Sequence, residues 1–419
     1  MDPRTEAALR TLQQEEPDAP WQARWQLWLF KYETGMKWGH YCEGPWKTAP
    51  AAFAPHKYRL LQGNPPGYPG SLEALTDPSN PLGFHTESAS LIENACCGTF
   101  HYGEHKTQSG WEAVTIKKRI LPPGIFNWLP AEAAALQEEA ALMAVREALQ
   151  AIPEPHHITH YLESYRHTDV TDGMEYMYYI TRFEGSIDLH VHIPALHDAW
   201  QSSGNSWKLV HAVKHCFKQI LQGLKVLHDC GWAHMDLKPS KVQVRMGSDG
   251  ATPHCTIVDL GASVGEDYPY PELLTLSHAA PEDLQRTMLL QLPERALFKP
   301  RDMWSLGCLL VHILTNASPF VQPQYIGSEY WSELDRSPEH EMRKIKATYA
   351  FVRSKHAAWE RDFDAGHGIP SGAAVLARLI PDKQQHRVVA RLLRSLLHPD
   401  PACRPSVDEV LNNDFLHGI

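Results

Sequence analysis

The sequence predicts an α+β protein with two unequal parts, a smaller part rich in strands and a larger part rich in helices, behind an N-terminal helical extension. Runs with the residue pattern of strands gather in the first half of the chain, at 88–92, 111–120, 161–165 and 176–183. One helical segment interrupts them at 131–150, and from residue 206 onward the pattern is mostly helical. Strands in one stretch followed by helices in another are typical of the α+β class.

Residues 1–86 are predicted to form an aromatic-rich extension and a linker. An amphipathic helix is expected at 18–34, because Asp18 can cap its start and Pro20 suits its first turn. Its aromatic side chains recur at helical spacing on one face: Trp21, Trp25, Trp28 and Tyr32. We expect this face to pack against the protein's own domain, and a docking face for a protein partner is the alternative. Prolines and glycines predict a loop at 63–83.

The later helical segments are predicted from composition and spacing. Residues 131–150 are rich in Ala, Leu and Glu, which are strong helix formers. Residues 206–229 place their apolar side chains on one face of a helix: Val210, Val213, Phe217, Leu221, Leu224 and Leu227. Residues 362–372, which contain three glycines and a proline, are predicted to form a loop.

Composition limits the class of protein. A chain of 419 residues that is 43% hydrophobic can bury a large core. Its net charge of −10, from 39 basic and 49 acidic residues, disfavours a general nucleic-acid or anionic-membrane binder. The eight cysteines form no C-x-x-C pair, and no apolar run is long enough to span a bilayer. We therefore expect a soluble intracellular protein of the cytoplasm that spans no membrane and binds no nucleic acid.

Two aspartates on separate loops carry the strongest chemical signal. Asp236 lies in the segment W-A-H-M-D-L-K-P-S-K at 232–241, with Lys238 two residues further on. Asp259 lies in T-I-V-D-L-G at 256–261. Phosphoryl transfer uses such a set, with one carboxylate for a hydroxyl, another for Mg²⁺, and a cation near the moving phosphate.

These segments resemble the H-R-D-L-K-P-x-N and D-F-G motifs of eukaryotic protein kinases. The likeness runs from about residue 88 to the C-terminus and includes A-P-E at 280–282. It implies a bilobal protein kinase fold, with a small β-rich N-lobe over 87–184 and a larger helical C-lobe over 185–419. Structural roles are implied for Glu282, for Arg404 as its buried partner, and for Asp302, which would anchor the catalytic loop.

The resemblance implies an ATP-dependent serine/threonine protein kinase that transfers the γ-phosphate to a protein hydroxyl, with ATP and Mg²⁺ as cofactors. Asp236 would orient the hydroxyl, Lys238 would offset charge at the γ-phosphate, and Asp259 would bind Mg²⁺. Lys117 would steady the α- and β-phosphates. Its best candidate ion-pair partner is Glu139, with Glu138 as the alternative. Other nucleotide-binding positions implied by the family are Ile92, Gly98, Thr181 and Phe183.

Four departures from the family pattern bear on activity. Only Gly98 remains of the three glycines expected in the loop at 92–100. Phe100 and Thr115 are larger than the family's valine and alanine over the adenine ring. Lys241 replaces the asparagine that ligates the second metal, and an ammonium cannot ligate a cation. It could pair instead with Asp236, with Asp259 or with a phosphate. Met235 replaces the arginine that gathers a phosphorylated activation segment, so we expect no switching of that kind.

The departures leave a second function class open. The retained Lys117, Asp236, Lys238 and Asp259 favour an active kinase. The lost glycines, the bulkier adenine-site residues and Lys241 favour a pseudokinase, a kinase-shaped scaffold or allosteric partner that binds nucleotide weakly or not at all. A small-molecule phosphotransferase is disfavoured by the intact A-P-E motif and the Asp302 region.

Overall fold

The protein is described here from a computed structural model. The residues described are 58–60, 98–121, 128–168, 175–184, 187–204, 206–246, 253–265, 277–289, 297–320, 345–354, 357, 379–380 and 382–417. Several predictions lie outside them: the helix at 18–34, the loops at 63–83 and 362–372, the strand at 88–92, and Ile92. The aromatic face at 18–34 and the cytoplasmic location stay predictions.

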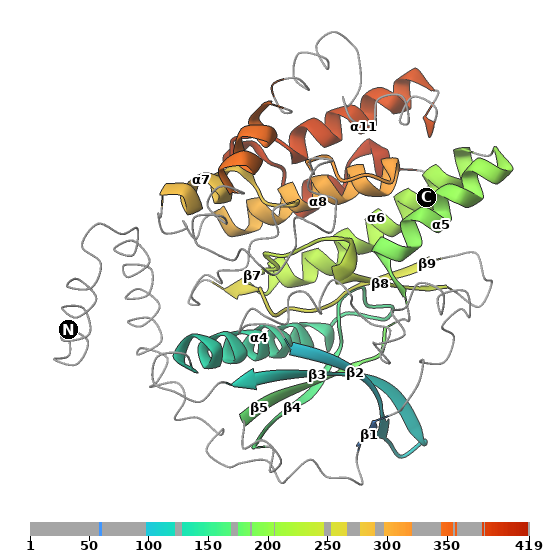
Figure 1. Cartoon of the computed structure of the whole chain (residues 1–419). Coiled ribbons are helices and arrows are strands. Elements are labelled where there is room, and N and C mark those ends of the chain that lie inside the picture. The colour runs from blue at the N-terminus through green and yellow to red at the C-terminus, as the bar shows by residue number, and fades with distance from the viewer. Residues whose placement is uncertain are drawn as a thin grey trace, which may run out of the picture.

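An antiparallel sheet of five strands forms one layer of the molecule (Figure 1), in the order β1-β2-β3-β5-β4. Its strands are β1 (Tyr58–Leu60), β2 (Gly98–Lys106), β3 (Trp111–Leu121), β4 (Tyr161–Thr168) and β5 (Glu175–Arg182). The strands predicted at 111–120, 161–165 and 176–183 correspond to β3, β4 and β5. In the central strand β3, Lys117 is in register with Phe100 of β2 and Tyr179 of β5.

The edge strand β1 lies inside the segment that we assigned to the extension. It pairs with β2 through Tyr58 opposite His105 and Leu60 opposite Gly103. The sheet therefore begins before residue 87, and residues 61–97 connect its first two strands. The division of the chain at residue 185 stays a prediction.

Helix α4 (Trp128–Leu149) lies between the sheet and the helical part of the molecule (Figure 1). The prediction of a helix at 131–150 is accurate to within three residues. Its apolar residues Ala141, Leu142 and Val145 are buried in the core that also holds the C-lobe helices. The Tyr179 hydroxyl on β5 donates a hydrogen bond of 2.8 Å to the Ala135 carbonyl and so ties α4 to the sheet.

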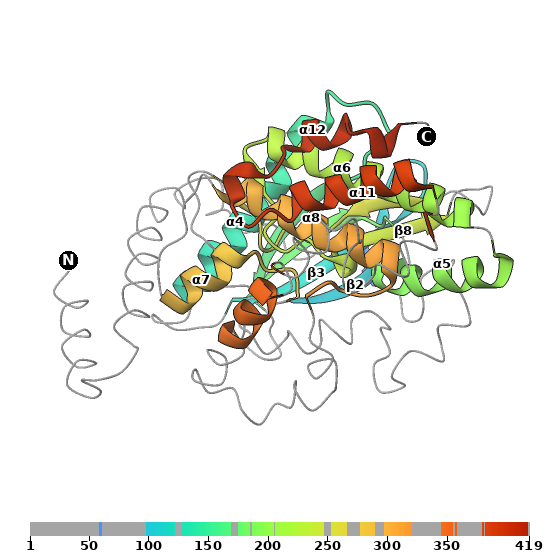
Figure 2. The same cartoon turned by 90° about the horizontal axis from the view of Figure 1, so that it is seen from above.

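Helices build the second part of the molecule. They are α5 (Leu189–Ser203), α6 (Ser206–Asp229), α7 (Pro281–Leu289), α8 (Phe298–Thr315), α11 (Lys383–Leu396) and α12 (Val407–Leu411). Helices α6 and α11 both contact α8, as the view from above shows (Figure 2). Every residue of the apolar face predicted on α6 is buried, from Val210 to Leu227. Among the described residues, no helix has the length and apolar character that crossing a membrane requires.

Short strands at the boundary between the two parts flank the two loops that hold Asp236 and Asp259. They are β6 (Ile187–Asp188), β7 (Trp232–Ala233), β8 (Val242–Met246), β9 (Pro253–Ile257) and β10 (Val264–Gly265). The loop holding Asp236 runs from β7 to the 3₁₀ turn η4 (Pro239–Lys241), and the loop holding Asp259 follows β9. The Val258 N–H donates to the Lys241 carbonyl at 2.9 Å, which places the two loops side by side.

Candidate active site

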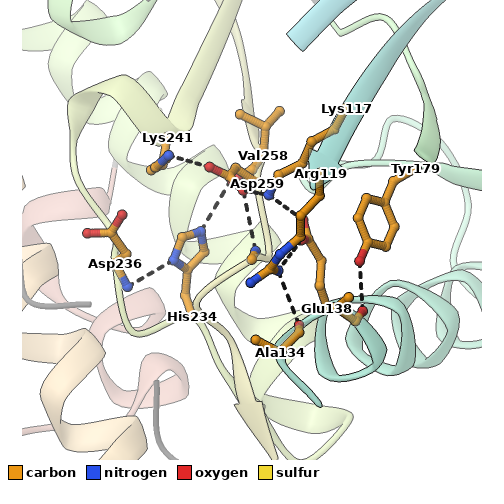
Figure 3. Close-up of polar contacts among 12 residues, drawn as sticks. Lys117, Arg119, Ala134, Glu138, Tyr179, His234, Asp236, Lys241, Val258 and Asp259 are labelled. Atoms are coloured by element: carbon orange, nitrogen blue, oxygen red, sulfur yellow. Dashed lines mark hydrogen bonds and ion pairs between the residues drawn. The ribbon is translucent and has the colours of Figure 1, made fainter. Parts of the chain in front are cut away.

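Lys117 joins the two parts of the molecule (Figure 3). Its Nζ lies 2.6 Å from Oε1 of Glu138 on α4 and 2.7 Å from Oδ1 of Asp259. Burial by itself lowers the pKa of Lys117, but the adjacent Asp259 and Glu138 carboxylates outweigh that effect and raise the pKa above its ordinary value. The amine is therefore a buried, fixed positive charge.

The ion-pair partner of Lys117 is Glu138, so our choice of Glu139 is wrong and the alternative is correct. Successive residues of a helix are rotated by about 100°, so only one of two neighbouring glutamates can face β3. Glu139 points toward β4, where it accepts hydrogen bonds from the Tyr161 hydroxyl, at 3.0 Å, and from Ser164. Burial raises the pKa of Glu139 to about 7.

Arg119 is a member of the site that the sequence analysis missed. Its Nη1 lies 3.2 Å from Oε2 of Glu138 and 3.3 Å from the Ala134 carbonyl, and its side chain is fully buried. Alternate residues of a strand point to the same face, so Arg119 lies beside Lys117 on β3. Glu138 is consequently held by two cations, one on each carboxylate oxygen. The two-residue spacing of basic residues within a predicted strand is the signal that could have revealed it.

Asp259 is also held by two cations. Its Oδ1 contacts Lys117 and accepts the Gly261 N–H at 3.3 Å, while its Oδ2 forms an ion pair with Lys241. Burial alone would raise the pKa of Asp259, but Lys117 and Lys241 outweigh burial and hold it well below its usual range. Its φ of 61° is left-handed, a conformation that aspartate tolerates better than bulky residues do. The carboxylate is thus ionised and enclosed.

Asp236 and Lys238 lie together on the neighbouring loop. Nζ of Lys238 is 3.2 Å from Oδ2 of Asp236. The Asp236 N–H donates to Nδ1 of His234 at 3.3 Å, so the proton of the ring is assigned to Nε2, which lies 3.3 Å from the Val258 carbonyl. Burial lowers the pKa of His234, and the ring is therefore neutral. This neutral histidine links the Asp236 loop to the Asp259 loop.

Asp302 on α8 holds the backbone of the same loop from beneath. Its carboxylate accepts the His234 N–H at 2.7 Å, the Met235 N–H at 2.8 Å and Nε2 of His228 at 2.9 Å. Asp302 is fully buried, and Met235 has a left-handed φ of 69°. Such a backbone conformation persists when several contacts hold it, and these three contacts provide that support.

Met235 packs where the family places an arginine. Its side chain belongs to a small buried apolar cluster that joins β7, β10 and α8: Ala233, Met235, Ala262, Val264 and Phe298. Within that cluster a methionine fills space between two strands and a helix, so the position contributes packing in place of charge.

Glu282 and Arg404 form a second ion pair, distant in sequence from the catalytic-type loops. The guanidinium is bidentate, with Nη1 2.6 Å from Oε1 and Nη2 2.7 Å from Oε2 of Glu282. Arg404 also donates to the Pro300 carbonyl at 3.0 Å. This planar geometry joins the start of α7 to the turn before α12.

The remaining predicted nucleotide positions lie on the sheet. Thr181, at the end of β5, is in register with Thr115 of β3, and both side chains are half-buried. The Phe183 N–H donates to the Ala113 carbonyl at 3.1 Å. Gly98 begins β2, opposite Arg119. The structure therefore brings these positions to the same sheet as Lys117, and their nucleotide contacts stay predictions.

The fold and the site together define a protein kinase domain. A sheet lysine, Lys117, pairs with a helix glutamate, Glu138, and the loops that hold Asp236 and Asp259 lie beside this pair. Residues 156–416 match the family model described as protein kinase domain. Because that segment is more than half of the chain, the chain belongs to the protein kinase family.

Several curated kinases are similar to this chain at low identity. The human dual specificity protein kinase CLK2 is 24% identical over 226 residues, covering 49% of this chain and 43% of that protein. The Caenorhabditis elegans serine/threonine kinase NLK is 28% identical over 210 residues, covering 49% and 30%. The mitogen-activated protein kinase pmk-1 of the same organism is 27% identical over 208 residues, covering 47% of each. The chain spans less than half the length of these relatives.

Proposed function

We propose that this chain is an ATP-dependent protein kinase that transfers the γ-phosphate to a serine or threonine hydroxyl of a protein substrate. The observation that supports this is the position of Lys117, whose Nζ lies within 2.7 Å of both Glu138 and Asp259. A lysine held in this way presents a fixed charge to the phosphates of a nucleotide, between the sheet and the Asp236 loop. The similarity to serine/threonine and dual-specificity kinases supports the same reaction.

Each polar residue of the Asp236 loop has a role in this proposal. Asp236 accepts a hydrogen bond from the substrate hydroxyl and takes its proton as the phosphate is transferred. Lys238, 3.2 Å from Asp236, offsets the negative charge that develops on the transferred phosphate. His234 and Asp302 hold the loop so that both side chains keep their positions.

A divalent cation does not fit the described arrangement of residues. Both oxygens of Asp259 contact ammonium groups, and Lys241 stands where the family supplies a second ligand. The Mg²⁺ expected from the family resemblance is thus at odds with the residues of this site.

The test is phosphoryl transfer from radiolabelled ATP to a generic protein substrate by the full chain and by Asp236→Asn. We expect the variant to lose about 100-fold or more of the activity, the usual contribution of a general base. The variant should stay folded, as checked by circular dichroism, because His234 and Asp302 still hold the backbone of the loop, although the loss of the Asp236–Lys238 ion pair lowers its melting temperature. Asp198→Asn, an exposed residue of α5, is the matched control and should be fully active. Equal transfer by wild type and Asp236→Asn would contradict the proposal.

A pseudokinase is the second candidate, and the Lys241–Asp259 ion pair favours it, because the pair occupies the carboxylate that kinases use for metal. In that case wild type and Asp236→Asn should both transfer no phosphate, while the chain remains folded. The same assay therefore separates the two functions.

A further inference from the structure

Lys241 is held in place by its backbone and by its side chain. Its N–H donates to the Lys238 carbonyl at 2.9 Å, and its carbonyl accepts the Val258 N–H at 2.9 Å. The ammonium group pairs with Oδ2 of Asp259, and only 13% of the side chain is exposed. Figure 3 shows Lys241 and Lys117 approaching Asp259 from opposite sides. The cation of Lys241 is therefore a built part of the site.

The cluster of ion pairs around Asp259 and Glu138 carries one more positive than negative charge, and the adjoining Asp236–Lys238 pair adds no net charge. Lys117, Arg119 and Lys241 supply three positive charges, and Glu138 and Asp259 supply two negative charges, so three minus two leaves one. A dication on Asp259 would lie within a few ångströms of two ammonium groups and would be repelled by both. A polyphosphate, by contrast, is attracted by this excess, and a lysine is a suitable point charge for it.

We propose that Lys241 takes the place of the divalent cation, so that this chain binds a nucleoside triphosphate without metal. The inference rests on the proposed function, because it concerns the same phosphate site. Asp259 then acts by positioning Lys241 and Lys117 toward the phosphates, and the two lysines supply the charge that a bound metal supplies in other kinases. The ligand class is a free nucleoside polyphosphate.

The experiment is a fluorescence titration of the full chain with mant-ATP, in excess EDTA and in MgCl₂ at matched ionic strength. For the wild type we expect the Kd in EDTA to stay within about threefold of the Kd in MgCl₂. For Lys241→Asn we expect the Kd in EDTA to rise by about tenfold or more and to recover in MgCl₂, because the asparagine oxygen can ligate a cation. Lys241→Arg keeps the charge and should keep metal-free binding.

Lys383→Asn is the matched control, an exposed lysine at the start of α11, which lies apart from the site (Figure 1). It should bind like the wild type in both buffers. Two results would overturn the inference and leave the proposed function standing. One is wild-type binding that requires MgCl₂, and the other is unchanged binding of mant-ATP by Lys241→Asn in EDTA. If Lys241→Asn fails to fold, the Lys241→Arg variant provides the test. Binding of mant-ATP by Lys241→Arg in EDTA supports the inference, and loss of that binding overturns it. Wild type that binds mant-ATP in neither buffer would overturn both proposals.

Discussion

Replacing Glu138 by glutamine tests whether the network around Lys117 stabilises the fold as its geometry indicates. Glu138 is 2% exposed, and its oxygens lie 2.6 Å from Nζ of Lys117 and 3.2 Å from Nη1 of Arg119. The amide would remove the negative charge that faces both buried cations, and Lys117 would keep only its contact with Asp259. Removing one partner of a buried ion pair costs about 3–5 kcal/mol. For a cooperative unit of ~250 residues, that lowers the melting temperature by roughly 6–20 °C.

The neighbouring glutamate provides the matched control. Glu139→Gln makes the same chemical change one residue away, on a side chain that contacts Tyr161 and Ser164. The pKa of Glu139 is raised to about 7 by burial, so near neutral pH much of the carboxyl already carries a proton and resembles the amide. We expect its substitution to cost less than about 1 kcal/mol, the range of a neutral hydrogen bond.

The assay is thermal unfolding of the wild type and both variants, followed by circular dichroism at neutral pH. Arg119→Met in the Glu138→Gln background should recover part of the lost stability, because it removes the buried guanidinium whose contact with the Glu138 carboxylate has been lost. The reasoning is refuted if Glu138→Gln unfolds at the wild-type temperature, or if Glu139→Gln is the more destabilised variant.

Two further predictions use contacts of the same site. A Cβ at Gly261 would lie 2.6 Å from Nζ of Lys117 and 3.1 Å from Oδ1 of Asp259, so Gly261→Ala should displace Lys117 and weaken mant-ATP binding by about tenfold. It should lower the melting temperature less than Glu138→Gln does, because both carboxylates remain, and an affinity equal to that of the wild type would contradict this reasoning. Because burial raises the folded-state pKa of Glu139 from 4.5 to about 7, its contribution to stability is fully present below pH 4.5 and is lost as pH rises through about 7. Between about pH 5 and about pH 8, the free energy of unfolding of the wild type should therefore fall by up to roughly 3 kcal/mol more than that of Glu139→Gln. Thermal melts across this range measure the difference. Parallel pH profiles of the two proteins would count against the raised pKa.

The sequence by itself determined the elements whose pattern is local. The apolar period of 206–229 predicts the buried face of α6, and the Ala/Leu/Glu-rich run predicts α4 to within three residues. Both signals repeat over several helical turns, so they do not depend on what the helix packs against. The motif at 232–241 likewise places Asp236 and Lys238 on one loop, because only two residues separate them.

Tertiary structure decided which charges meet. Glu138 and Glu139 are equivalent in sequence, and only the packing of α4 on β3 turns Glu138 toward Lys117 and Arg119. The strand β1 is three residues long and pairs with β2 across residues 61–97, so its local pattern is too short to indicate a strand.

For Lys241, the sequence left Asp236, Asp259 and a phosphate open as partners, and the structure places it on Asp259. The physical reason is the hydrogen bond from Val258 to the Lys241 carbonyl, which aligns two loops that are separate in sequence. Register between distant segments is set by backbone pairing and core packing, and neither is encoded in the spacing of residues within one loop.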